Sequence, residues 1–320
     1  MGGTGPDLKV DRPRARGHCS AMIAATALVL PFPDISPDIF RLTLGGITIA
    51  PKWYAAAYIV GIVGGWLMAR WAAPRAALWP GNTPLATRAQ IEDIMTWITL
   101  GIVLGGRLGY VLFYQPQYYL SHPLEILYIW EGGMSFHGGM IATGLLVIVY
   151  AMKHGIPIRS LLDLAALCTP LGLGLGRLAN FVNAELWGRP STLPWAVVFP
   201  GGAAQDCENV GELCARHPSQ LYEATLEGLV LLVVLWAVAL AGGLKARGLV
   251  CGLFLAGYGA ARIFVEHFRQ ADAQYITPNN PLGHVIGWGE FGLSMGQVLS
   301  LPMLVVGLGG AFLAVRAARR

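Results

Sequence analysis

The sequence has little charge. Of its 320 residues only 12% are Asp, Glu, Lys or Arg, whereas 55% are hydrophobic, and the mean hydropathy is +0.54. Soluble domains carry about 25% charged residues, so this chain has too few polar residues to cover a surface in water. This excludes an ordinary soluble enzyme, a disordered chain and a nucleic-acid-binding module, and no nucleic acid is expected as a partner.

Metal-binding and repeat patterns are also missing. The five cysteines include no Cys-x-x-Cys pair and no Cys/His cluster at zinc spacing, so no metal site is expected. Two of them, Cys207 and Cys214, share one connecting segment, where a disulfide and a pair of reduced thiols are both open. No internal repeat is visible, so an inverted-repeat transporter gains no support.

Long apolar runs are what the sequence does contain. A transmembrane helix needs about 20 mostly apolar residues, and these runs lack the alternation of barrel strands. The 42 glycines have no period and suit tightly packed membrane helices. The sequence predicts an all-α integral membrane protein with seven transmembrane helices. The expected spans are 53–70, 94–114, 135–152, 161–182, 220–241, 248–268 and 297–315.

The basic residues between these spans predict the orientation. Only three Lys or Arg residues fall in the second, fourth and sixth connections, namely Arg189, Arg216 and Arg269. By the positive-inside rule, the amino end lies outside and the carboxyl end is cytoplasmic. The other connections and the tail hold ten, namely Arg70, Arg75, Arg88, Lys153, Arg159, Lys245, Arg247, Arg316, Arg319 and Arg320.

The amino-terminal segment does not fit this pattern. Residues 1–20 are basic, and the apolar run 21–30 that follows is too short for a span and has no clear cleavage site. We interpret residues 1–30 as an extension, and favour Met22 as the natural start over a processed leader. Residues 31–320 are then one membrane domain, with an outer loop at about 183–219.

Polar side chains within the expected spans gather at one level. Charges inside spans are costly and usually functional. Six of the seven spans place polar groups in their outer halves, whereas the inner halves hold little besides Asp163. Because arginine binds phosphate oxygens well, this level suggests a site for an anionic lipid headgroup. The polar residues are Tyr54, Arg107, Tyr110, His137, Arg177, Asn180, Asn183, Glu223, Glu227, Arg262 and Glu266, with Glu185 just beyond.

Helical spacing places some of these residues on shared faces. Tyr258, Arg262 and Glu266 follow one another at four-residue intervals, so they form one stripe. The alternative is structural, since Arg262 with Glu266, and Arg177 with Glu185, could be internal ion pairs of the bundle.

His137 is flanked by glycines, in Glu-Gly-Gly-Met-Ser-Phe-His-Gly-Gly at 131–139. Glycines let a ligand approach closely, so His137 is a candidate general base, and a hydrogen-bonding role in an apolar context is equally open. The run Gly-Leu-Gly-Leu-Gly-Arg at 172–177 lies in a span and lacks the strand–turn–helix context of a phosphate-binding loop. We expect its glycines to serve helix packing.

These motifs together resemble one family. The run Gly-Arg-Leu-Ala-Asn-Phe-Val-Asn-Ala-Glu-Leu-Trp-Gly-Arg at 176–189 resembles the signature of the prolipoprotein diacylglyceryl transferase family. The resemblance runs from about 30 to 314, with Ala179 where the family more often has Gly and a longer segment at 200–216. Also similar are Trp53-Tyr54, Gly-Arg-Leu-Gly-Tyr at 106–110, Ser-Phe-His-Gly-Gly at 135–139, His-Pro-Ser-Gln-Leu-Tyr-Glu-Ala at 217–224, and the stripe of Tyr258, Arg262 and Glu266.

The resemblance implies a reaction and its partners. Phosphatidylglycerol would donate its diacylglyceryl group to the lipobox cysteine thiol of an exported prolipoprotein, recognised with its signal peptide. The products would be a thioether and glycerol 1-phosphate. The family implies no metal or organic cofactor. It implies a multi-pass protein of the bacterial cytoplasmic (inner) membrane, in contact with membrane lipids, whose active site faces the periplasm.

The resemblance and the chemistry together suggest residue roles. A thiol with a pKa of about 8.5 must be deprotonated, and charge on the leaving phosphate must be stabilised. We expect Arg177 and Arg262 to hold the phosphate and His137 to act as base, with a carboxylate or water as the alternative base. Expected catalytic residues are His137, Arg177, Tyr258, Arg262 and Glu266; expected substrate-binding residues are Tyr54, Arg107, Asn180, Asn183, Glu185 and Gly188.

Three other classes of protein compete with this interpretation. A polytopic transporter with a proton or anion relay predicts polar groups at the midplane and in the inner half as well. A metal-dependent phosphatidyltransferase needs clustered aspartates, which are scattered here. A non-catalytic scaffold does not need six helices that contribute polar groups to one level.

Overall fold

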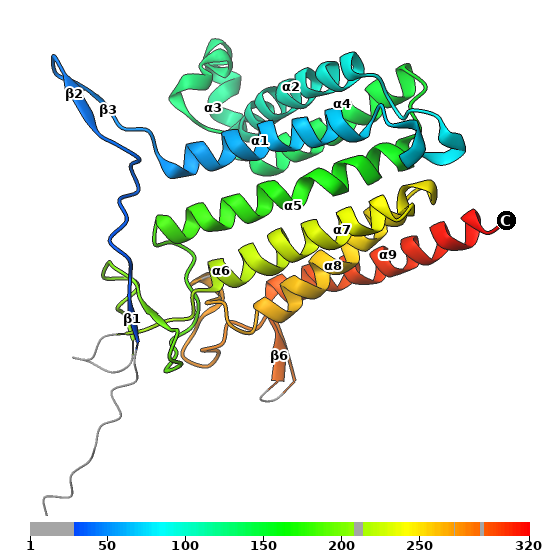
Figure 1. Cartoon of the computed structure of the whole chain (residues 1–320). Helices are drawn as coiled ribbons and strands as arrows, with labels where there is room; N and C mark the ends of the chain where they lie inside the picture. Colours follow the sequence, from blue (N-terminus) through cyan, green and yellow to red (C-terminus); the bar gives the residue numbers. More distant parts are fainter. Residues whose placement is uncertain (1–28, 208–213, 272, 289–290) are drawn as a thin grey trace, which may run out of the picture.

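The computed structural model describes residues 29–207, 214–271, 273–288 and 291–320. All seven segments expected to span the membrane are helical, and consecutive ones run antiparallel, side by side (Figure 1). This confirms the expectation of a helical membrane protein. The segments are α1 (Trp53–Ala72), α2 (Arg88–Phe113), α4 (Phe136–Lys153), α5 (Ile158–Val182), α6 with η5 and α7 (Ser219–Glu223, Ala224–Val230 and Leu231–Leu240), α8 (Leu249–Val265) and α9 (Met295–Ala318).

Membrane-spanning length is met by five of these segments. Within the described residues, α1, α2, α5, the continuous segment Ser219–Leu240 and α9 are long and apolar enough to cross a membrane. Helices α4 and α8 are apolar but shorter, at Gly138–Lys153 and Leu249–Val265. Large apolar side chains such as Ile59 and Val305 are exposed on the helix surfaces. Lipid suits such surfaces, so the chain is a multi-pass membrane protein.

Glycines bring neighbouring helices close together. A Cβ on Gly228 would lie 2.5 Å from the Cα of Gly174, so α5 and η5 touch backbone to backbone. A Cβ on Gly252 of α8 would lie 2.8 Å from the carbonyl oxygen of Gly307 of α9. Small residues permit such approaches between membrane helices. The expected packing role of the glycines at 172–177 is therefore confirmed for Gly174.

Short elements connect the helices. α3 (Pro116–Ser121), η3 (Pro123–Leu127) and η4 (Ile129–Glu131) link α2 to α4, whereas η1 (Ala76–Leu78) and η2 (Pro80–Asn82) link α1 to α2. η6 (Gly243–Lys245) precedes α8, and η7 (Ala273–Tyr275) follows it. Three two-stranded sheets complete the described residues: β1 (Leu30–Pro31) parallel to β4 (Val197–Val198), and the antiparallel pairs β2 (Leu42–Leu44) with β3 (Ile47–Ile49) and β5 (Ile286–Trp288) with β6 (Phe291–Leu293).

The amino-terminal boundary can be compared with the expected extension at 1–30. Residues 1–28 lie outside the described part of the chain. Leu30, however, pairs with Val197, and Phe32 packs against Phe199, so the chain from Leu30 onward contributes to the fold. The boundary between extension and membrane domain stays a prediction.

The two ends of the helix bundle differ. The start of α1 and the ends of α5 and α8 lie at one end (left in Figure 1), together with the long connections that precede α6 and follow α8. Here Cys207 and Cys214 form a disulfide, one of the two states left open by the sequence. The other end holds the start of α5 and the carboxyl end of α9 (right in Figure 1). Its core includes Trp79 and Tyr150, both almost fully buried.

Candidate active site

The close approach of α5 and η5 brings charged side chains into one cluster. Arg177 lies on α5 just after Gly174, and Glu223 and Glu227 lie on either side of the start of η5. η5 is a π-helical turn. Such local departures from α-helical geometry often mark functional sites. We call the set the charge cluster; it comprises Arg177, Glu223, Glu227, Arg262, Glu266 and Arg269.

Glu223 is the centre of this cluster. Its side chain is 0% exposed and it pairs with three arginines. The distances from its carboxylate oxygens are 3.0 Å to Nε of Arg177, 2.5 Å to Nη1 of Arg262 and 3.3 Å to Nε of Arg269. One buried carboxylate therefore joins guanidinium groups from α5, from α8 and from the connection after α8. Removing such a buried partner leaves uncompensated charges, which is strongly destabilising.

Two further carboxylates complete the cluster. Glu266 lies 3.3 Å from Nη2 of Arg262 and 3.6 Å from Nη1 of Arg269. Glu227 is also 0% exposed, but its carboxylate is 4.0 Å from both Arg177 and Arg262, and neither of its oxygens has a hydrogen-bond partner among the described residues. Three arginines thus face three glutamates, a balance that holds the guanidinium groups in fixed positions.

The arginines lie on the accessible side of the cluster. The side chains of Arg177 and Arg262 are 20% and 13% exposed, whereas Glu223 and Glu227 are fully buried behind them. Arg177 pairs through Nε, and its two Nη groups make no hydrogen bond within the described part of the chain. Those nitrogens are free for bidentate contact with an anionic oxygen group.

The end of α5 places amide and carboxylate groups beside Arg177. Asn180 and Asn183 donate from Nδ2 to Oε1 of Glu185, at 2.7 and 3.4 Å. The Glu185 side chain itself is exposed, so it is oriented by these amides without being buried. Tyr54 of α1 shares a hydrogen bond of 3.3 Å with the hydroxyl of Tyr58 and interacts electrostatically with Glu185 and Arg177.

The expected site residues therefore fall into different environments. Arg177, Tyr258, Arg262 and Glu266 come together, because Tyr258 interacts electrostatically with Arg177 and Arg262. Within the described residues Arg177 pairs with Glu223 and not with Glu185, so of the two ion pairs considered from the sequence only Arg262 with Glu266 forms. The cluster therefore contains ion pairs that join helices of the bundle, and its guanidinium groups are still partly exposed.

Arg107 has different partners. Arg107 is 4% exposed, and its guanidinium donates to the carbonyl oxygens of Glu125, Ile126, Gly132 and Gly133, at 2.6 to 3.3 Å. It therefore holds the segment between α2 and α4 in place. A substrate contact by Arg107 stays a prediction.

Gly188 and His137 also stay predictions. Gly188 is buried, and a Cβ there would lie 2.7 Å from the carbonyl oxygen of His217, so close backbone packing accounts for a glycine at this position. The backbone of His137 lies in the first turn of α4, after Ser135, whose hydroxyl accepts a hydrogen bond from the Gly138 amide. The His137 side chain lies outside the described part of the structure.

The chain before α6 is hydrogen-bonded to Tyr222, the residue that precedes Glu223. The indole Nε1 of Trp195 donates to the Tyr222 hydroxyl at 2.8 Å, and that hydroxyl lies 3.2 Å from Nδ1 of His217. Burial lowers the pKa of His217, and the positive charge of Arg189 lowers it further. A lowered pKa favours the neutral imidazole, which shares a hydrogen bond with the Tyr222 hydroxyl through Nδ1.

Arg216 holds the same segment before α6 in place. Arg216 is 3% exposed. Its guanidinium lies 4.2 Å from the centre of the Trp187 ring and donates to the carbonyl oxygens of Ala204 and Asp206 at 2.6 and 2.9 Å. Burial lowers its pKa. Since Glu223 follows seven residues later, this anchoring helps to place the centre of the cluster.

Three members of the cluster were missed as site residues by sequence reasoning. Glu223 and Glu227 stand out as carboxylates in an apolar span, and their four-residue spacing was the available signal. Arg269 lies three residues after Glu266, in the connection that follows α8. Among the described residues, no group of three or more His, Cys, Asp and Glu side chains is placed to hold a metal ion.

The fold and this site define a class: a multi-pass membrane protein whose helices share a buried cluster of paired charges with arginines on the accessible side. The family model of prolipoprotein diacylglyceryl transferase matches residues 39–313. The chain therefore belongs to the prolipoprotein diacylglyceryl transferase family.

Individual relatives agree along most of their length. A phosphatidylglycerol–prolipoprotein diacylglyceryl transferase of Ruegeria pomeroyi is 60% identical over 281 residues, which is 88% of this chain and 95% of the relative. The protein of the same name from Roseobacter denitrificans is 55% identical over 283 residues, 87% of this chain and 95% of the relative. That of Sinorhizobium medicae is 50% identical over 288 residues, 89% and 94% of the two chains.

Proposed function

We propose that this chain transfers the diacylglyceryl group of phosphatidylglycerol to the lipobox cysteine thiol of exported prolipoproteins, and releases glycerol 1-phosphate. The observation that carries the proposal is the charge cluster, in which accessible arginines rest on buried glutamates. Family membership and the names of the relatives support the same reaction. A carbon–sulfur bond forms, the bond between the glyceryl carbon and the phosphate oxygen breaks, and the thiol proton must be removed.

Arg177 and Arg262 hold the phosphate of the lipid. Charge accumulates on the phosphate oxygens as the carbon–oxygen bond breaks, and fixed guanidinium groups stabilise that charge. Glu223 keeps both arginines in position, so no reorganisation is needed when the charge develops. Binding an anion beside three carboxylates requires that the free Nη groups of Arg177 face the lipid, and these have no other hydrogen-bond partner among the described residues.

The residues at the end of α5 orient the headgroup. Asn180, Asn183 and Glu185 form one hydrogen-bonded group beside Arg177, and Tyr54 lies within electrostatic reach of it. Carboxylate and amide groups suit the glycerol hydroxyls of the donor lipid. Tyr258 and Glu266 set the position of Arg262.

His137 removes the thiol proton. Its place at the start of α4, beside the tightly packed glycines of α2 and α4, supports this role. An imidazole titrates close to neutral pH and suits a thiol with a pKa of about 8.5. A carboxylate or water is the alternative proton acceptor.

The membrane arrangement is seven spans with the amino end outside and the carboxyl end in the cytoplasm. We place the protein in the bacterial inner membrane, with the charge cluster toward the periplasm. The alternation of basic connections supports this orientation. The Cys207–Cys214 disulfide supports it too, because disulfides persist in the oxidising periplasm and are rare in the cytosol.

Activity of the purified full chain tests the proposal. The protein in detergent is incubated with phosphatidylglycerol, a lipobox peptide and a chelator, and the expected product is a peptide that carries one diacylglyceryl thioether by mass spectrometry. A peptide with Ser in place of the lipobox Cys is the matched control and should stay unmodified. If the Ruegeria pomeroyi relative forms product in the same assay and this chain does not, the proposal is wrong.

A further inference from the structure

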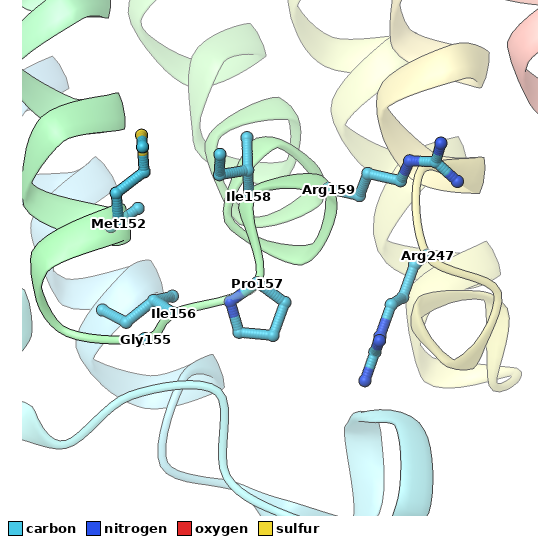
Figure 2. Close-up of a pocket in the computed structure, with 8 residues that line it drawn as sticks. Met152, Gly155, Ile156, Pro157, Ile158, Arg159 and Arg247 are labelled. Atoms are coloured by element: carbon cyan, nitrogen blue, oxygen red, sulfur yellow. The ribbon is translucent and has the colours of Figure 1, made fainter.

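A second group of arginines lies at the end of the bundle opposite the charge cluster. A pocket of about 550 Å³ opens there between the α4–α5 connection and the connection from α7 to α8. Arg159, in the first turn of α5, and Arg247, just before α8, both line it (Figure 2). We call it the arginine pocket.

The wall of the arginine pocket is apolar. Met152, Ile156, Pro157 and Ile158 line it, and Figure 2 shows Pro157 and Ile158 between Met152 and the arginines. The Met152 side chain is 70% exposed at the end of α4. Apolar side chains next to two arginines suit a lipid, whose acyl chains adjoin a charged headgroup.

Neither arginine of the pocket is paired within the described residues. Arg159 and Arg247 are exposed, and neither makes a hydrogen bond or an ion pair within the described residues. No Asp or Glu lies among the described residues that line the pocket. In the charge cluster, by contrast, every arginine forms an ion pair with a glutamate.

Asp163 is close to Arg159 in the sequence but supplies no counter-charge to the pocket within the described residues. It lies four residues after Arg159, the spacing of a helical ion pair. Instead, its oxygens accept hydrogen bonds from the backbone amides of Gly248 at 2.6 Å and Cys251 at 2.8 Å, and the side chain is 0% exposed. The carboxylate thus fastens the start of α8 to α5, and Arg247 and Arg159 line the same pocket.

We propose that the arginine pocket binds the phosphate group of an anionic phospholipid in the leaflet opposite the charge cluster. Two guanidinium groups that are unpaired within the described residues offer forked donors to phosphate oxygens, and basic pockets between membrane helices bind anionic headgroups in this way. Free phosphate carries the same chemistry, but the apolar wall favours a lipid. The bound lipid is not the donor of the transfer reaction, because the pocket lies at the other end of the bundle.

Thermal unfolding of the full-length protein in detergent tests this proposal. The probe is phosphatidylserine, which is anionic but is not the donor lipid, and it is compared with phosphatidylcholine and with inorganic phosphate. We expect phosphatidylserine alone to raise the Tm of the wild type, since a ligand that binds the folded state stabilises it. The double variant R159Q/R247Q should need roughly tenfold more phosphatidylserine for the same rise.

The matched control is R316Q/R319Q, which removes two exposed positive charges from the same end of the bundle. It should respond like the wild type. An equal loss in both double variants would mean that general surface charge attracts the lipid, and a rise with inorganic phosphate alone would rule out a lipid as the ligand. An unchanged response of R159Q/R247Q would also overturn the proposal.

Two further measurements keep the test valid if a variant is unstable. Native mass spectrometry counts retained phosphatidylserine directly, and R159Q/R247Q should retain one molecule fewer than the control. In R159K/R247K the charge remains but the forked donor is lost, so an intermediate affinity is expected. Wild-type affinity in that variant would contradict bidentate arginine contact.

Discussion

The two ends of the helix bundle both hold arginines, but they hold them in opposite ways. In the charge cluster, Glu223 is fully buried and pairs with Arg177, Arg262 and Arg269. At the other end, Arg159 and Arg247 are exposed and unpaired within the described residues, and the buried carboxylate nearby, Asp163, binds backbone amides instead.

The difference concerns how much each arginine can move. A buried pair is costly to desolvate and is kept only with good geometry, so it fixes the guanidinium groups in one arrangement. An exposed arginine keeps its rotamers and its hydration, and gains little from any one contact. The first arrangement suits catalysis on a developing charge, whereas the second suits reversible binding of a lipid headgroup.

Removing a cluster arginine should give the largest effect. Arg177→Ala and Arg262→Ala are each expected to lower the rate of diacylglyceryl transfer by about 10²- to 10³-fold, because each removes a donor aimed at developing charge. The rate is measured with phosphatidylglycerol and a lipobox peptide. Arg316→Ala, at the other end of the bundle, is the control and should be near normal. Near-normal transfer by either cluster variant would contradict the phosphate-binding role.

Replacing His137 should give a smaller effect that depends on pH. Loss of a general base costs about 10²-fold or more, but thiolate forms without a base as the pH approaches about 8.5, so we expect a loss at the low end of that range. His137→Gln should therefore be about 100-fold slower at pH 7 and recover part of the rate at pH 8.5, in the same transfer assay. A variant with full activity across the pH series would rule out the base role.

The two buried glutamates should differ from each other. Glu223→Gln removes the charge that pairs with three arginines, and we expect a loss of stability of about 3 kcal/mol together with reduced transfer. Glu227→Gln is the matched variant. Its carboxylate has no hydrogen-bond partner among the described residues, so we expect a smaller loss, under about 1 kcal/mol. Chemical unfolding in detergent measures both, and equal losses would show that Glu223 is not the centre of the cluster.

The smallest expected effect is the pH dependence of stability from His217. Burial, and then the charge of Arg189, lower the pKa of His217 in the folded protein below its ordinary value of about 6.5. The unfolded chain then binds more protons at acid pH, so stability is full above pH 6.5 and falls as the pH drops from there toward the folded pKa.

The measurement is the Tm of the wild type and of His217→Asn between pH 7 and pH 5. The wild type should lose more of its Tm on acidification than the variant does. His154→Asn, at the other end of the bundle, is the control and should keep the wild-type slope. If Tm changes with pH equally in all three proteins, His217 is not the cause of the pH dependence.

Much of the fold could be predicted because the apolar runs are long and strong. All seven expected segments are helical, within a few residues at most ends, although α2 begins at Arg88, before the expected 94, and five of the segments meet the length and hydropathy of a span. The contacts within the site were harder to predict from the sequence. Glu223 was visible as a buried charge, but its three partners come from separate parts of the chain, and no local pattern pairs it with Arg269.

Arg107 illustrates the limit of reading a charge within a span. Its depth and motif predict contact with substrate, but in the structure its donors meet the carbonyl oxygens of the segment 125–133. Sequence spacing indicates which residues share a helix face, and it carries no information about carbonyl groups from a connection about twenty residues further along.

The sequence by itself determined the membrane, the helical segments, the level of the polar residues and the resemblance to one family. These follow from local properties: the length of apolar runs, the placement of basic residues and contiguous motifs. Only the tertiary structure decided which arginine meets which glutamate, and that Asp163 holds Gly248 rather than Arg159. These contacts depend on how closely two backbones approach, as at Gly174 and Gly228, and on the π-helical turn beside them, which are properties of packing between distant segments.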